Sequence, residues 1–102
     1  MKDTEKPNYS LEEIKLTFNT IEKLNMTFSS MHGQYKLGFS DQEVVDAIQA
    51  LTPSDFYKSM PPNHKSYFAW HDVYKPTFNN IDLYIKFQVD KRGEMIISFK
   101  AR

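Results

Sequence analysis

The spacing of hydrophobic residues changes near the middle of the chain. From residue 10 to 51, apolar side chains recur every three to four positions, which indicates amphipathic helices. From residue 55 to 100, they alternate with polar side chains at a period of two, which indicates strands. This order of elements predicts an α+β fold in which N-terminal helices pack on one side of a β-sheet.

Start and stop signals divide the first half into three helices. Two Ser-x-x-Glu patterns are capping boxes that predict helix starts: Ser10 with Glu13, and Ser40 with Glu43. Between them a shorter helix is predicted for residues 27–35, and Gly38 ends it. Helical spacing places the following residues on the apolar faces of the outer two helices: Leu11, Ile14, Phe18, Ile21, Val44, Val45, Ile48 and Leu51. Residues 1–9 are predicted to form a frayed tail.

The last two strands form the clearest pair. Asp90-Lys91-Arg92-Gly93-Glu94 fits a hairpin with a three-residue loop, in which Gly93 takes the left-handed conformation. If Asp90 pairs with Glu94, every apolar residue of one row meets an apolar partner: Val89 meets Met95, Phe87 meets Ile97 and Ile85 meets Phe99. The same register predicts that Tyr84 and Lys100 are cross-strand neighbours on the face away from the core.

Composition and charge narrow the possible functions. With 102 residues, the chain is predicted to form a single domain, residues 1–102. The net charge is zero, but the halves differ: residues 1–51 carry five lysines and eight acidic residues, and residues 52–102 carry eight basic and five acidic residues. The positive charge therefore falls on the strands that are rich in aromatic residues. This pattern favours local anion binding over tight non-specific binding along a polymer.

Several kinds of site and location are not expected. The absence of cysteine excludes a disulfide scaffold and a cysteine-based zinc site. His32, His64 and His71 lack metal-ligand spacing, so neither a metal nor another cofactor is predicted. The polar N-terminus does not fit a signal peptide, and no apolar run approaches the length of a membrane span. A cytoplasmic location is the resulting prediction.

The predicted sheet offers the groups that cleave RNA without a metal. The 2′-hydroxyl must lose a proton, the leaving 5′-oxygen must gain one, and cations must stabilise the phosphorane between them. Histidine has an unperturbed pKa suited to proton transfer at neutral pH. Aromatic rings can stack on bases and lysines can hold phosphates. The candidates on the strands are Tyr57, Lys58, His71, Tyr84, Lys86 and Lys100. Each also has a purely structural interpretation as a strand former or a solvated surface residue.

Four segments carry a resemblance to a known family, and they occur in the same order and at similar spacing. They are Ser54–Met60 (SDFYKSM), Trp70–Pro76 (WHDVYKP), Leu83–Lys86 (LYIK) and Ser98–Lys100 (SFK). Together they resemble the MqsR family of bacterial toxins, closely in residues 51–102 and more loosely from residue 10 onward. The resemblance implies a RelE-like fold, which is an antiparallel sheet with helices packed on it. It also implies ribosome-independent cleavage of mRNA at GC-containing sites, typically GCU.

The resemblance also implies a site and a partner. Carried over by motif, the catalytic set is Lys58, His71, Tyr84 and Lys100, with Tyr57 and Lys86 as RNA-binding neighbours. The implied partner is a cognate MqsA-like antitoxin that holds the toxin inactive, and any zinc would belong to that partner. Better-known members have glutamine at the position of His71, so the proton-transfer roles in this chain are open. The alternatives are a non-catalytic RNA-binding or protein-interaction module, or a degenerate, inactive toxin.

Overall fold

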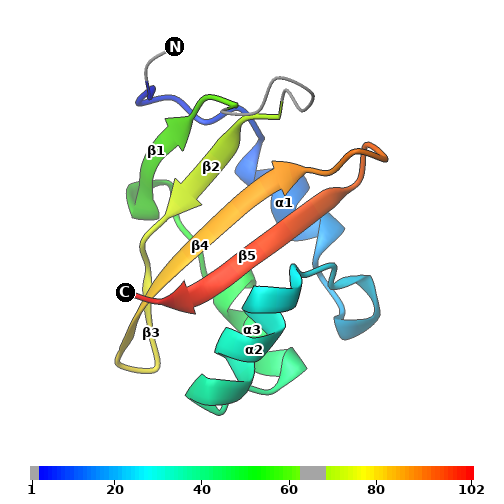
Figure 1. The fold of residues 1–102 in the computed structure, drawn as a ribbon. Coiled ribbons are helices and arrows are strands. Elements are labelled where there is room, and N and C mark those ends of the chain that lie inside the picture. The colour runs from blue at the N-terminus through cyan, green and yellow to red at the C-terminus, as the bar shows by residue number, and fades with distance from the viewer. Residues whose placement is uncertain (1–2, 63–68) are drawn as a thin grey trace.

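The computed structural model describes residues 3–62 and 69–102, and it has an α+β architecture in which helices precede the sheet (Figure 1). This confirms the predicted fold class. The elements are α1 (Leu11–Thr17), α2 (Phe28–Leu37), α3 (Asp41–Gln49), β1 (Phe56–Met60), β2 (His71–Tyr74), β3 (Thr77–Phe78), β4 (Ile81–Val89) and β5 (Met95–Ala101), with 3₁₀ turns at Ile21–Lys23 and Pro53–Asp55. His64, Tyr67 and Phe68 lie outside the described residues. No described helix has the length and apolar character needed to cross a membrane.

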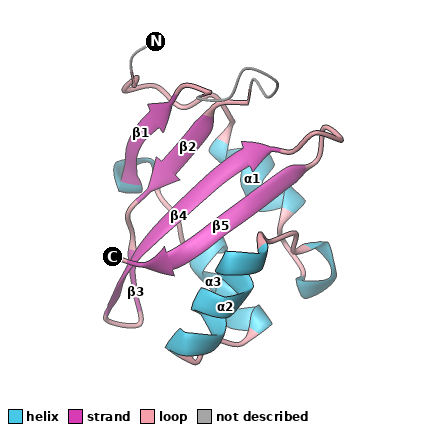
Figure 2. Ribbon diagram, viewed as in Figure 1, coloured by secondary structure: helices cyan, strands magenta, loops and turns pink. Residues whose placement is uncertain are grey.

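Strand β4 is the centre of the sheet (Figure 2). One of its edges pairs with β5, while β2 and β3 pair with successive parts of its other edge, and β1 extends the sheet beyond β2. All of these pairings are antiparallel. Because neighbouring residues of a strand point to opposite faces, the register of these strands decides which side chains share a face.

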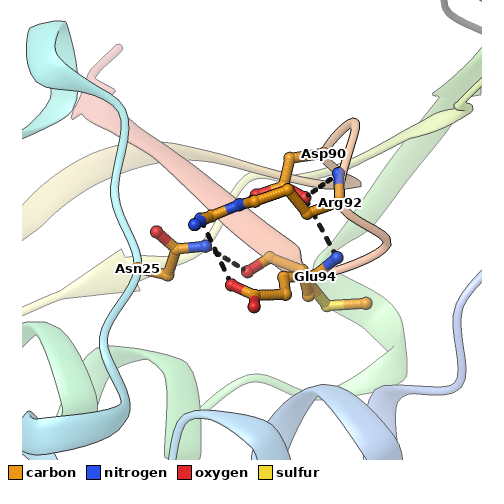
Figure 3. Close-up of polar contacts among 5 residues, drawn as sticks. Asn25, Asp90, Arg92 and Glu94 are labelled. Carbon is orange, nitrogen blue, oxygen red and sulfur yellow. Dashed lines mark hydrogen bonds and ion pairs between the residues drawn. The ribbon is translucent and has the colours of Figure 1, made fainter.

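The predicted hairpin register is confirmed residue by residue. Tyr84 pairs with Lys100, and Phe87 pairs with Ile97. Gly93 has a φ of 82°, the left-handed value expected of it. The Asp90 carboxylate accepts hydrogen bonds from the backbone amides of Arg92 (2.9 Å) and Glu94 (3.0 Å), as Figure 3 shows. Asp90 therefore fixes the loop that sets the register of both strands.

The helix boundaries follow the capping signals. Ser40 and Glu43 form the expected capping box at the start of α3. Thr27 caps α2, which ends at Gly38 with a φ of 73°. The first helix is shorter than predicted, because α1 ends at Thr17 and Ile21 lies in a 3₁₀ turn with 43% of its surface exposed.

One face of the sheet, the core face, packs against the helices (Figure 1). Phe18 at the end of α1 stacks on Phe87 of β4 with ring centroids 6.2 Å apart. Tyr74 of β2 meets the same Phe87 ring edge-on at 5.8 Å. The fully buried strand residues of this face are Tyr74, Leu83, Ile85, Phe87, Ile97 and Phe99. They are alternate residues of their strands, which leaves the residues between them on the opposite face.

The prediction of a frayed tail at residues 1–9 is wrong for the described part, residues 3–9. Thr4 forms an antiparallel bridge with Ser59, with backbone hydrogen bonds of 2.8 and 2.9 Å. Asp72 is fully buried, and its carboxylate accepts hydrogen bonds from the amides of Asn8 and Tyr9 and from the Ser59 hydroxyl. A buried carboxylate needs such donors, so the N-terminal segment is held against the sheet.

Strand β3 was missed because it has only two residues. It pairs with the start of β4 through a two-residue turn, in which Asn79 and Asn80 have φ values of 52° and 63°. Positive φ at both central residues is the type I′ arrangement, which asparagine tolerates well.

Candidate active site

The face of the sheet opposite the core, here called the open face, gathers basic side chains from four strands. Its central row runs across the sheet from Lys58 of β1 to Val73 of β2, then to Lys86 of β4 and Ser98 of β5. Cross-strand partners point to the same side, so Lys58 and Lys86 flank Val73 on this face. Residues that are 28 positions apart in sequence are thereby brought onto one surface.

The second row contains Tyr84 and Lys100, which the sequence predicted to be neighbours. The Lys100 Nζ atom lies 5.0 Å from the centroid of the Tyr84 ring. Both residues line a cavity of about 240 Å³, together with Lys86 and with Ser29 of α2. Burial, and secondarily the nearby charge of Lys100, lowers the pKa of Lys86. Two cations and a phenol thus converge on one small concave site.

Helix α2 fixes the strand that carries Lys100. Backbone bonds join Ile97 to Asn25 and Thr27, just before the helix, along the outer edge of β5. The buried Ser30 hydroxyl then accepts a hydrogen bond of 2.7 Å from the Phe99 amide. A Cβ atom at Gly33 would meet the Phe99 carbonyl oxygen at 3.0 Å, so glycine allows this close approach of the helix without a shift of β5.

Tyr57 lies beside this face because β1 carries an irregularity between Phe56 and Lys58. Tyr57 is 48% exposed, and the Lys75 Nζ atom lies over its ring at 3.6 Å from the centroid. Lys75 was absent from the predicted site. The alternation in Asp72-Val73-Tyr74-Lys75 could have indicated it, because a buried core-face Tyr74 leaves Lys75 to point the other way.

Lys58 has an acidic partner in the N-terminal segment. Its Nζ atom lies 2.9 Å from an Asp3 carboxylate oxygen. The hydrogen bond to Asp3 raises the pKa of Lys58, and the ion pair leaves the lysine side chain 30% exposed. Lys58 therefore remains protonated at neutral pH, with an anion already in contact with it.

His71 occupies the third row of the open face. It pairs with Met60 of β1, and the β2–β4 register continues to place it opposite Gln88. The side chain is half-buried, and this burial, followed by the charge of Lys86, lowers its pKa from 6.5. At neutral pH the imidazole is therefore mainly neutral and able to accept a proton.

The predicted residues share one face but are not all in contact. On β4, Lys86 lies two positions from Tyr84 and two positions from Gln88, the residue opposite His71. Two residues of a strand span roughly 7 Å, so His71 and Tyr84 stand on either side of Lys86 and roughly 13 Å apart along the strand. A group bound above Lys86 could be approached from both sides. No three metal-ligating side chains converge among residues 3–62 and 69–102.

Two comparisons with known proteins identify the family of this chain. A family model described as "Motility quorum-sensing regulator, toxin of MqsA" matches residues 6–101. The chain is also 30% identical over 96 residues to the mRNA interferase toxin MqsR of Escherichia coli (strain K12), an alignment that spans 94% of this chain and 95% of that protein. The family match begins at residue 6, after Asp3 and Thr4, and covers the helices and all strands of the open face. The chain belongs to the MqsR family of toxins.

Proposed function

We propose that this toxin is an endoribonuclease that cleaves mRNA without the ribosome and without a metal ion. The observation that carries the proposal is the open face, where cations and proton-transfer groups from four strands share one face of the sheet. The E. coli relative is named an mRNA interferase, which supports RNA as the substrate. A preference for GC-containing sites such as GCU rests on the family resemblance.

The geometry favours a scissile phosphate placed above Lys86. In cleavage by the 2′-hydroxyl, the attacking and leaving oxygens lie on opposite sides of the phosphorus, so the base and the acid must also be on opposite sides. His71 and Tyr84 flank Lys86 in this way. We assign the neutral His71 as the base that takes the 2′-hydroxyl proton, and Tyr84 as the acid that protonates the 5′-oxygen.

The lysines supply the charge that this reaction needs. The phosphorane carries more negative charge than the starting diester, and fixed cations stabilise it most when water is partly excluded. Lys86 is half-buried, and Lys100 shares its cavity. Lys58 reaches the same face from β1, and Tyr57 with Lys75 offers a charged aromatic surface for a neighbouring nucleotide.

The family description also names MqsA, of which the family is the toxin. We therefore propose an MqsA-like antitoxin as the protein partner that holds this toxin inactive. The cytoplasm, where mRNA is translated, is the compartment in which both partners would act.

Mapping of 5′ ends on a mixed-sequence RNA tests the proposal directly. Purified protein in EDTA should generate fragments with 5′-hydroxyl ends and 2′,3′-cyclic or 3′-phosphates, with cuts enriched at GC-containing sites. Strict dependence on Mg²⁺ would contradict the mechanism. RNA binding without cleavage would favour the alternative of a non-catalytic RNA-binding module.

A further inference from the structure

The N-terminal segment brings an acidic side chain to the open face. Thr4 is bonded to Ser59 through both its amide and its carbonyl, so the segment runs along the free edge of β1. Farther along, the amides of Asn8 and Tyr9 bind the buried Asp72. These two attachments hold the intervening residues beside the sheet and fix where Asp3 enters the site.

The Asp3 carboxylate forms an ion pair with Lys58. The two charged atoms are 2.9 Å apart, which is the contact a lysine makes with either kind of oxyanion. Among the described lysines, Lys58 is the one with an ion-pair partner. We propose that Asp3 is an internal competitor of RNA: its carboxylate stands in for a backbone phosphate at Lys58 and must leave before RNA binds there. This inference rests on RNA being the ligand of the open face.

Tethering makes a weak carboxylate an effective competitor. A group held next to its binding site acts at an effective concentration in the millimolar range, so even a weak contact can compete. Because Thr4 is fixed at the strand edge, only the Asp3 side chain has to rotate away when RNA arrives. Lys58 and Asp3 are 30% and 46% exposed, so water screens the pair and the competition is modest. We expect Asp3 to weaken RNA binding roughly two- to fivefold.

Competition between Asp3 and RNA also predicts how RNA binding depends on salt concentration. The salt slope is the slope of the logarithm of the binding constant against the logarithm of the salt concentration. When a lysine that was free before binding neutralises a phosphate, counterions condensed on the RNA are released, and this adds about 0.7 to the magnitude of the slope for a single strand. A lysine that exchanges a carboxylate of its own chain for a phosphate adds much less to the slope. Removing the Asp3 charge should therefore steepen the slope by about 0.7 while it tightens binding.

The test compares Asp3→Asn with Glu5→Gln. Both variants remove one negative charge from the same exposed segment, but only Asp3 contacts Lys58. Binding of a 2′-O-methyl oligonucleotide, which cannot be cleaved, is measured by fluorescence anisotropy at several salt concentrations. Asp3→Asn should bind about two- to fivefold more tightly than wild type with the steeper slope, and Glu5→Gln should match wild type. In a Lys58→Ala background, Asp3→Asn should bring no gain.

Several results would overturn the inference. Equal gains from both variants would show a general charge effect. Weaker binding by Asp3→Asn would show that Asp3 orients Lys58, and a gain that survives Lys58→Ala would show that Asp3 acts on another residue.

Cleavage of a matched RNA is measured in parallel, so that the proposed nuclease activity and the proposed competition by Asp3 can be tested separately. If the protein cleaves RNA but Asp3→Asn does not change binding, only the proposal that Asp3 competes with RNA is wrong. If every variant binds RNA and none cleaves it, only the proposed nuclease activity is wrong. If RNA does not bind at all, both proposals are wrong.

Discussion

The two faces of the sheet are built from the same strands and yet have opposite chemistry. On β4 the core face carries Ile85 and Phe87, both fully buried, while the residues beside them, Tyr84 and Lys86, point to the open face. The core face takes its free energy from apolar burial, which tolerates conservative change. The open face carries cations held close together, which repel one another in the absence of an anion. One face therefore stabilises the fold and the other costs stability for the sake of binding.

The register links the two faces. A slip of one residue between β4 and β5 would expose Phe87 and bury Lys86, because the side-chain period is two. The apolar pairs of the core thus hold Tyr84 beside Lys100 by fixing the register of the two strands. Substitutions on the two faces should separate stability from activity, and the following variants test that separation.

Phe87→Ala should have the largest effect, and it should act on the fold. The ring is fully buried and contacts both Phe18 and Tyr74. Truncation of such a ring costs about 3–5 kcal/mol of unfolding free energy. Urea denaturation followed by circular dichroism measures it. A loss below about 1 kcal/mol would show that the core face is packed differently.

Lys100→Ala should have a comparable effect on catalysis but leave the fold intact. Loss of a well-placed transition-state cation costs roughly 2.7–4 kcal/mol, a decrease of about 10²–10³ in kcat. Single-turnover cleavage of an RNA oligonucleotide measures it. Lys91→Ala, in the exposed hairpin loop, is the matched control and should cleave like wild type. If both variants lost cleavage activity equally, Lys100 would have no specific role in the site.

Asp72→Asn should have an intermediate effect on stability. The buried carboxylate accepts bonds from Asn8, Tyr9 and Ser59, and hydrogen bonds to a charged group contribute about 1.5–3 kcal/mol each. Asparagine keeps one acceptor, so we expect the loss of roughly one such bond. Hydrogen exchange should show faster exchange of the Asn8 and Tyr9 amides. Unchanged protection there would contradict the anchoring role of Asp72.

His71→Gln should have the smallest effect on rate but change the shape of the pH profile. Burial lowers the pKa of His71 below 6.5, and a base works in its neutral form. The wild-type rate should therefore fall as the pH drops through that lowered pKa. Glutamine, which the family resemblance implies at this position in better-known members, keeps a hydrogen bond but cannot titrate. The variant should stay active and lose this acid limb, and an unchanged profile would leave Tyr84 as the better candidate for the base.

Local patterns predicted what is local in the structure. The hairpin register followed from apolar pairing and the Gly93 loop, and it placed Tyr84 beside Lys100 correctly. The helix caps at Ser10 and Ser40 also followed from short motifs. Which face of β1 and β2 joins that site depends on pairing between strands that are distant in sequence. The candidates Lys58 and His71 came from their side-chain chemistry and from the family resemblance, not from a predicted register.

The missed features depend on long-range contacts or on very short elements. Nothing in the polar sequence of residues 3–9 indicates that its amides will bind Asp72, more than 60 residues away. The contact of Asp3 with Lys58 is equally remote in sequence. The asparagine pair at residues 79–80 was a visible turn signal, but a two-residue strand is too short to show a period.

The attachment of the N-terminal segment to Asp72 also has a kinetic consequence. Contacts between residues distant in sequence form late in folding, because the entropy of closing the loop must be lost before the contact is made. Completion of the open face needs β1, β2, β4 and β5 in register and the segment docked at the edge of β1. A chain emerging from the ribosome should therefore present no assembled cleavage surface until most of its length has been synthesised. Such a delay would separate the synthesis of this toxin from the onset of its activity.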